Sequence, residues 1–438
     1  MVPSRRQPKL ASWLLWLFIL LLITATSATF GAIFAAVKTL IAPVEPPLIS
    51  KALDSIQLDD DSSTPFQSRL SRPVNILVMG VDRVPEATPN SPELFHGRSD
   101  TILLLRLDPT DKSVTLLSIP RDTQVKLPEI GLTKISEANA RGGSNLAMQT
   151  LTATLNNVPI ERYVRVSSGA FRELVDLLGG VDVLVPYPMS YVDNTQQLKI
   201  NLAQGWQTLN GEQADQFARF RNDGLGDLGR IQRQQALIQA IWNRLSNPTV
   251  LTRLPELIRV MQKYVDTNLN FEEILALANF SLQLDRDRLK MVMLPGRSSS
   301  EEGDRRSYWI VDEARRDRVL SQYFKVGSSD FTSEGRSSNQ SESLVRNLKI
   351  AVQNASGNPQ AAKRLIAYLA EQGFSKVSVV EDWPDRQRQS QIIVQGGDLA
   401  GAEALKKALG GGKIEVAATG YLESDLTVRL GEDWAKKF

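Results

Sequence analysis

The chain has 438 residues, a length typical of two or three domains, and its 51 Lys and Arg against 49 Asp and Glu leave a net charge of +2. So balanced a charge does not favour a polyanion such as nucleic acid as partner. The absence of cysteine excludes disulfides and thiolate metal sites, and the single histidine, His96, argues against a His-rich zinc site or a Ser-His-Asp triad. Any chemistry must therefore depend on Asp, Glu, Arg, Lys and hydroxyl groups.

Residues 10–37 contain no charged side chain and follow a short basic tail, residues 1–9. As a helix the segment is long enough to cross a hydrocarbon core of ~30 Å. The basic tail favours a cytoplasmic N-terminus, so we predict a single-pass anchor in the plasma (inner) membrane with all later domains extracytoplasmic. The alternative is a signal peptide cleaved after Ala28, but the uncharged run continues well past that point.

A spacer rich in Pro, Asp and Ser is predicted over 38–71, before a globular region at 72–325. That region opens with three apolar strands, V-N-I-L-V-M-G-V, T-I-L-L-L-R-L and V-T-L-L-S-I, which indicate a sheet covered on both faces. Amphipathic helices are expected over 144–157 and 167–178, where a Gly-Gly pair ends the second helix. Residues 230–284 have a helical, apolar pattern, and another strand follows them.

A flexible linker is predicted over 326–345, because Ser, Gly and charged residues dominate it. The remaining segment, 346–438, is expected to be a small domain with the order strand, helix, strand, strand, helix, strand. The predicted fold class is therefore α/β: an α-β-α sandwich with a mixed central sheet, a small C-terminal α+β domain, and an N-terminal transmembrane helix before both.

The segment 214–235 concentrates arginines, namely Arg219, Arg221, Arg230 and Arg233. An extended backbone would place Arg219 and Arg221 on one face, and three glycines after them would permit a tight turn. Arg230, Arg233 and Gln234 would then share one face of a helix that starts there. Guanidinium groups bind phosphate oxygens in pairs, so this stretch indicates a phosphate or pyrophosphate site. A solvated loop with salt bridges is the alternative.

Charged residues also mark the ends of the first three strands: Asp82 after the first, Arg98 and Asp100 before the second, and Arg121 with Asp122 after the third. Ligands of open α/β sheets lie at the carboxyl ends of strands, so all three sites coincide only if the second strand is antiparallel to its neighbours. Carboxylates without histidine or cysteine suit Mg²⁺. Each site alone is more typical of a turn or cap, whereas together with the arginines they indicate phosphoryl transfer. No G-x-x-x-x-G-K-[ST] loop is present, which argues against a nucleotide-dependent kinase.

The order of several motifs over 72–325 resembles the LytR-CpsA-Psr family. These motifs are N-I-L-V-M-G-V-D, R-S-D-T, S-I-P-R-D-T, L-V-D-L-L-G-G-V-D-V, L-N-G-E-Q-A, F-A-R-F-R and G-D-L-G-R-I-Q-R-Q-Q. The tail, with V-Q-N-A-S-G and L-T-V-R-L-G-E-D-W, is similar to the LytR C-terminal domain. One departure is K-I-S-E-A at 134–138, where the family usually has K-I-N-H-A, so the role of that His or Asn is in doubt.

The resemblance implies a Mg²⁺-dependent (or Mn²⁺-dependent) extracytoplasmic phosphotransferase. It would move a glycopolymer from a polyprenyl-diphosphate carrier to a peptidoglycan hydroxyl, forming a phosphodiester and releasing polyprenyl phosphate. By the same resemblance Asp82 and Asp100 hold the metal ion and act in catalysis with Arg98 and Arg121. The residues implied to bind the pyrophosphate are Arg98, Arg121, Arg219, Arg221, Arg230, Arg233, Asp227 and Gln234. The helices at 235–281 would line a polyprenyl pocket or simply form core.

Two alternatives remain open at this stage. A polyprenyl-diphosphate-sugar pyrophosphatase would use the same residues with water as acceptor, and a non-catalytic envelope protein would bind or regulate glycopolymers without turnover. Binding to DNA is not expected, because the sequence shows no helix-turn-helix with a basic recognition face and the predicted topology is extracytoplasmic.

Overall fold

The structure is a computed structural model that describes residues 70–82, 91–193, 198–220, 226–245, 256, 259–260, 263–284, 288–299, 307–326 and 348–437. Residues Pro65–Phe438 form one compact unit. The predicted tail, anchor and most of the spacer lie outside the described residues, as does the linker from residue 327 onward. Among the helices that are described, none has the length and apolar character needed to cross a membrane.

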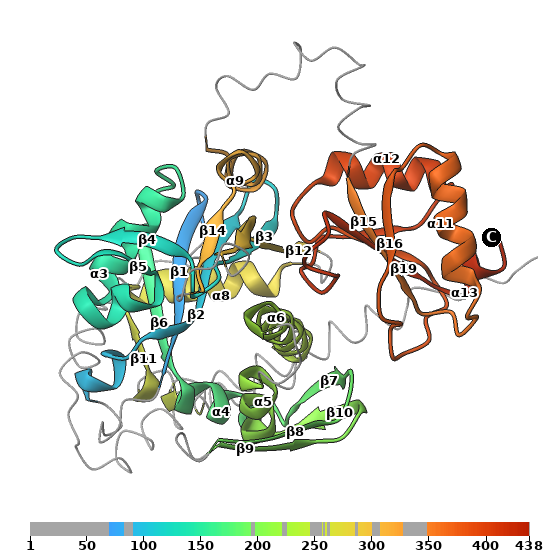
Figure 1. The fold of residues 1–438 in the computed structure, drawn as a ribbon. Coiled ribbons are helices and arrows are strands. Elements are labelled where there is room, and N and C mark those ends of the chain that lie inside the picture. The colour runs from blue at the N-terminus through green and yellow to red at the C-terminus, as the bar shows by residue number, and fades with distance from the viewer. Residues whose placement is uncertain are drawn as a thin grey trace, which may run out of the picture. The chain divides into compact units, whose positions relative to one another are not determined.

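A six-stranded mixed sheet forms the centre of the N-terminal part, in the order β11-β6-β1-β2-β3-β12 (Figure 1). Its strands are β1 (Val74–Val81), β2 (Ser99–Asp108), β3 (Ser113–Ser118), β6 (Arg162–Ser167), β11 (Val265–Thr267) and β12 (Leu289–Met293). Strand β2 is antiparallel to both β1 and β3, whereas β6 runs parallel to β1 and β12 parallel to β3. The predicted mixed central sheet is confirmed.

Helices cover both faces of this sheet, as the continuous apolar strands predicted. Alternate residues of adjacent strands, such as Leu104 and Leu117, are fully buried in one cluster with Leu151 of helix α3 (Ser136–Thr154). On the opposite face, Leu103 belongs to an apolar cluster against which helix α6 (Gly226–Leu245) packs. Ile76 belongs to a second cluster, against which helix α8 (Phe271–Leu282) packs. Because both faces of the sheet are buried, apolar residues in these strands do not alternate with polar ones.

Further short elements surround the sheet. The remaining helices of this part are η1 (Pro92–Phe95), α4 (Ser168–Leu177), α5 (Gly211–Arg219), α9 (Glu313–Val319) and η5 (Leu320–Phe324). Four hairpin-like pairs join β4 (Gln124–Leu127) with β5 (Gly131–Lys134), β7 (Val181–Val185) with β10 (Gly205–Leu209), β8 (Met189–Asp193) with β9 (Leu198–Leu202), and β13 (Gly296–Ser298) with β14 (Trp309–Val311). Gly179 and Gly180 end α4 with φ of 75° and 88°, which confirms the predicted stop signal.

Three expectations about local structure were wrong. Arg219 is the last residue of helix α5 and not part of an extended segment, because Asn210 and Gln213 form a capping box that starts a helix there. Gly226 and Gly229 belong to α6 and not to a turn. The short strand β11 interrupts the helical pattern predicted over 230–284, since its residues pair with the free edge of β6.

The C-terminal domain contains a second sheet in the order β16-β15-β19-β17-β18. Its elements are β15 (Lys349–Asn354), α11 (Ala361–Glu371), β16 (Lys376–Val379), β17 (Gln391–Ile393), α12 (Leu399–Leu409), β18 (Lys413–Glu415), β19 (Leu426–Leu430) and α13 (Glu432–Ala435). The predicted order of strands and helices is confirmed, and β18 and α13 are additional short elements. The domain has its own buried cluster, which includes Ile350, Leu365, Leu405, Val428 and Trp434.

An ion pair between β6 and α8 gives a first testable prediction. Arg162 Nε donates to Glu273 Oε1 at 2.9 Å, and these hydrogen bonds hold the pKa of Glu273 below its usual value. A depressed carboxyl pKa stabilises the fold above the pKa of the unfolded chain, and the gain is lost as the pH falls through the folded pKa. We expect Glu273→Gln to lower the free energy of unfolding by about 1 kcal/mol at pH 7 and by less in acid.

Urea titrations at several pH values measure this difference. Glu272, the preceding acidic residue of the same helical turn, is exposed, so Glu272→Gln is the matched control. An equal loss in both variants, or a loss from Glu273→Gln that does not depend on pH, would contradict the assigned ion pair.

Candidate active site

A cavity of about 290 Å³ lies where β1 ends and β2 begins. Its lining combines two kinds of side chain. The charged and amide residues are Asp82, Asp100, Asp215, Arg219, Arg230 and Gln234. The larger apolar residues are Val78, Val81, Leu103, Val166, Phe171, Leu237, Ile238 and Ile241. A cavity built in this way can accept a molecule with an anionic group joined to an apolar chain.

Strand pairing brings the two predicted carboxylates together. Asp82 directly follows β1, and Asp100 is the second residue of β2. Because the strands are antiparallel, Gly80 pairs with Thr101, so both acids lie at the same end of the sheet. The N–H of Asp82 also donates to the carbonyl of Arg98 at 3.0 Å. The condition set by the sequence, an antiparallel second strand, is met.

Arg121 reaches the same point from the end of β3. The antiparallel register of β2 and β3 pairs Leu103 with Ser118, which places the residues after β3 beside the start of β2. Arg121 Nη1 donates a short hydrogen bond to Asp100 Oδ1. Its Nε lies 3.7 Å from Asp122 Oδ1, and Lys134 Nζ lies 2.9 Å from the same oxygen. Arg121 is thus oriented toward the carboxylate pair by an adjacent acid.

Two further arginines approach from helix ends. Arg219, at the C-terminus of α5, lies with Nη2 3.5 Å from Asp82 Oδ1. Arg230, in the N-terminal half of α6, is only 3% exposed and has Nη1 4.0 Å from Asp100 Oδ2. Gln234 lies one helical turn after Arg230 and lines the same cavity, as the predicted i, i+4 spacing requires.

The two carboxyl groups have different proton affinities. Burial raises the pKa of Asp82 to about 6, and the negative charge of Asp100 adds to this, while Arg219 and Arg121 oppose it. Burial acts on Asp100 in the same direction, but the charges of Arg121 and Arg230 hold its pKa below the usual value. At neutral pH Asp100 is therefore a stable anion, whereas Asp82 is the group that can exchange a proton.

The two carboxylates at the strand ends match the ligands of a hard divalent cation. Asp82 and Asp100 offer only carboxylate oxygens, which hard divalent cations prefer. The described residues contain no group of three or more metal-ligating side chains, and a site with two carboxylates would take its other ligands from water and phosphate. The pair therefore fits Mg²⁺ or Mn²⁺ bound together with a phosphorylated substrate.

Other predicted site residues are not in the cavity lining. Arg98 is exposed and forms an ion pair of 2.6 Å with Glu137, one of the two residues at which K-I-S-E-A departs from the family motif. Arg233 is buried, donates to the carbonyl of Phe220, and has its guanidinium 5.5 Å from the ring of that residue. Arg221 lies outside the described residues, as does the side chain of Asp227.

Asp215 is a charged cavity residue that the sequence motifs did not predict. Asp215 is 5% exposed, accepts a hydrogen bond from Arg172 Nε at 3.0 Å, and lies 3.8 Å from Arg219 Nη1. It therefore helps to hold Arg219 at the cavity. In the sequence, Asp215 stands four residues before Arg219, a spacing at which opposite charges pair on one face of a helix. This spacing could have indicated its contact with Arg219.

Comparison with known families places both parts of the chain. A model described as the LytR-CpsA-Psr family matches residues 49–325, more than half of the chain. A model described as the LytR cell envelope-related transcriptional attenuator matches residues 347–434.

Individual relatives agree with this. An uncharacterized protein of Staphylococcus aureus is 35% identical over 233 residues, 53% of this chain and 57% of its own length. The polyisoprenyl-teichoic acid–peptidoglycan teichoic acid transferase TagV of Bacillus subtilis is 31% identical over 248 residues, 56% of this chain and 61% of its own length. The match therefore spans less than two thirds of either relative.

Among solved structures, that of a protein from Streptococcus agalactiae is similar, with a TM-score of 0.50 and 26% identity over 57% of this chain and 88% of that one. The same conclusion follows from the sequence motifs, from the mixed sheet and from the match to the family model. The chain belongs to the LytR-CpsA-Psr family.

Proposed function

We propose that this protein is an extracytoplasmic phosphotransferase that moves a glycopolymer from a polyprenyl-diphosphate carrier to a hydroxyl of peptidoglycan. The observation that carries the proposal is the composition of the 290 Å³ cavity, which joins three carboxylates and two arginines to an apolar wall. The name of the Bacillus subtilis relative, a teichoic acid transferase acting between a polyisoprenyl carrier and peptidoglycan, supports the same class of reaction.

The charged part of the cavity suits a diphosphate. Arg219 and Arg230 line it, and Arg121 bonds to the carboxylate that Arg230 also approaches. Guanidinium groups bind phosphate oxygens through paired N–H donors, and at a buried site such contacts are stronger than in water. These arginines would stabilise the charge that develops on the leaving polyprenyl phosphate.

The apolar part of the cavity suits the prenyl chain. Leu237, Ile238 and Ile241 come from α6, the helix that also carries Arg230, while Phe171 comes from α4. Burial of apolar surface stabilises a complex by roughly 25 cal/mol per Å². One helix would thus bind the diphosphate through its N-terminal half and the first prenyl units beyond it.

Asp82 is the residue best suited to activate the acceptor. Arg121 and Arg230 both engage Asp100 and hold its pKa below the usual value, whereas Asp82 forms an ion pair with Arg219, so Asp82 keeps the more available oxygen for a proton. The acceptor hydroxyl would donate its proton to an Asp82 oxygen while the new O–P bond forms and the bond from phosphorus to the bridging diphosphate oxygen breaks. Asp82 and Asp100 would hold the divalent cation, and this ion would neutralise diphosphate charge when bound.

The site would require an extracytoplasmic location, because its acceptor is peptidoglycan. A single-pass anchor at residues 10–37, with the N-terminus in the cytoplasm, would place the site there. Such an anchor would keep the cavity close to the membrane that holds the carrier lipid.

Loss of the charged residues should slow transfer strongly. We expect Arg121→Ala and Asp100→Ala to lower kcat by about 10²–10³-fold, as removal of preorganised charge stabilisation does in other enzymes. The assay would combine the full-length protein, a sugar-diphosphate-polyprenyl lipid, Mg²⁺ and peptidoglycan fragments, with products followed by mass spectrometry. The matched control is Arg141→Ala, because the Arg141 side chain is 61% exposed and is absent from the cavity lining.

The products separate this proposal from its alternatives. A phosphodiester conjugate that disappears in both site variants supports the transferase. Free sugar phosphate from the wild type, in the presence of acceptor, would indicate a pyrophosphatase. Binding of lipid without any product would leave a glycopolymer-binding protein.

Removal of the cation provides a separate test. We expect chelation by EDTA to stop transfer and Mg²⁺ or Mn²⁺ to restore it, because two carboxylates repel a diphosphate unless a cation binds with them. Asp100→Asn should raise the Mn²⁺ concentration needed for half-maximal binding, measured by electron paramagnetic resonance without substrate. Transfer that persists at full rate in EDTA would contradict the metal assignment.

A further inference from the structure

The C-terminal domain covers the open edge of the central sheet. Strand β12 forms one edge of that sheet, and its N–H groups at Met291 and Met293 donate to the carbonyls of Val416 and Gln395 at 2.9 and 3.3 Å. Exposed strand edges tend to associate with other chains, so a covering domain satisfies groups that would otherwise face solvent. The domain is thereby fixed to the sheet through its backbone.

Apolar side chains extend this contact onto helix α6. Ala418, fully buried, lies in one cluster with Met293 and with Ile231, the residue after Arg230. A second cluster joins Met291 of β12 to Ile393 and Ala417 of the C-terminal domain. These residues are as buried as those of a domain core, which indicates a stable contact rather than a transient one.

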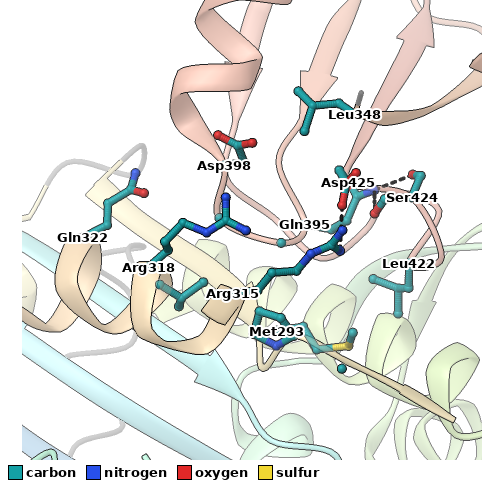
Figure 2. A pocket seen from close by; sticks show the side chains of 15 residues that line it. Met293, Arg315, Arg318, Gln322, Leu348, Gln395, Asp398, Leu422, Ser424 and Asp425 are labelled. Carbon is teal, nitrogen blue, oxygen red and sulfur yellow. Dashed lines mark hydrogen bonds and ion pairs between the residues drawn. The ribbon is translucent and has the colours of Figure 1, made fainter. Parts of the chain in front are cut away.

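On the other side of the same contact a charged pair and a small cavity are present. Figure 2 shows Arg315 of α9 pointing to Asp425 of the C-terminal domain, with 2.8 Å between Nη1 and Oδ1. Gln395, whose carbonyl accepts from Met293, donates through Nε2 to Ser424 Oγ at 2.7 Å. The cavity that these residues help to line has a volume of about 120 Å³.

The connection to the active site passes through Gln235. This residue is fully buried, follows cavity-lining Gln234 directly, and bridges two parts of the fold. Its Nε2 donates to Ser118 Oγ at the end of β3, and its Oε1 accepts from the N–H of Ala418, both at 2.8 Å. A neighbouring residue of α6, Gln232, donates through Nε2 to the carbonyl of Gly420.

We propose that the C-terminal domain positions helix α6, with Gln235 as the positioning residue, and so holds Arg230 and Gln234 at the cavity. A buried amide with both partners in place is costly to disturb, because each lost partner leaves an unsatisfied polar atom. Arg230 Nη1 lies 4.0 Å from Asp100 Oδ2. A small displacement of α6 would therefore move the Arg230 guanidinium and weaken its binding of an anion in the cavity. The consequence for diphosphate binding rests on the proposed function, whereas the restraint on α6 does not.

Hydrogen–deuterium exchange of the full-length protein tests the restraint without any substrate. Gln235→Met preserves the side-chain volume but removes both hydrogen bonds, and Ala418→Glu alters only the C-terminal domain, where the larger side chain has no room. We expect both to speed amide exchange in α6 by about tenfold, the loss of one to two hydrogen bonds. Gln239→Met, on an outer position of the same helix, should leave exchange in α6 unchanged.

Exchange in α3 and α11 should stay at wild-type rates, which verifies that both domains remain folded. The second readout is the affinity for farnesyl diphosphate, a short prenyl diphosphate, measured by titration calorimetry. We expect an affinity about tenfold weaker in Gln235→Met and Ala418→Glu, and unchanged in Gln239→Met.

Unchanged exchange in α6 in both variants would overturn the proposal. Faster exchange in α6 with unchanged affinity for farnesyl diphosphate would also overturn it, because the helix would then be restrained without effect on the site. A wild type that does not bind farnesyl diphosphate would instead contradict the proposed function, and the exchange data would still decide whether the domain holds α6.

Discussion

The antiparallel pairing of β1 and β2 is the constraint on which the site depends. It places Asp82 and Asp100 at one end of the sheet, although the whole loop between β1 and β2 separates them along the chain. If the two strands were parallel, the start of β2 would lie at the opposite end of the strands, away from Asp82. The same logic brings Arg121 to Asp100, because β3 again reverses direction. Three successive strands thus converge on one point through alternating direction.

The charges at this point are nearly balanced without ligand. Arg121 and Arg230 share Asp100, and Arg219 lies between Asp82 and Asp215. A diphosphate adds negative charge beside partly buried acids, so a divalent cation would restore the balance. The unequal pKa values of the two acids follow from the same arrangement, since Asp82 has fewer close cations than Asp100.

Local pattern predicted much of the fold, but long-range contacts decided the details of the site. The apolar strands and the glycine stop after α4 could be read from the sequence, as could the residues that line the cavity at the strand ends. The sequence could not show that Arg233 packs against the ring of Phe220 and not into the cavity. Arginines close together on one helix can face different neighbours, and the tertiary fold decides which. Nor could it show that Glu137 would engage Arg98 from a separate element. One hydrogen-bond partner of Gln235, the N–H of Ala418, lies 183 residues away, beyond any local pattern.

In the proposed reaction a sugar hydroxyl, and not water, attacks the diphosphate. The most direct measurement is the reaction run in ¹⁸O-labelled water with a polyprenyl-diphosphate glycan, Mg²⁺ and peptidoglycan fragments, followed by mass spectrometry of the phosphate. Direct transfer predicts a phosphodiester conjugate whose phosphate contains no ¹⁸O. Sugar phosphate carrying one ¹⁸O atom, formed at the same rate with or without acceptor, would contradict the account.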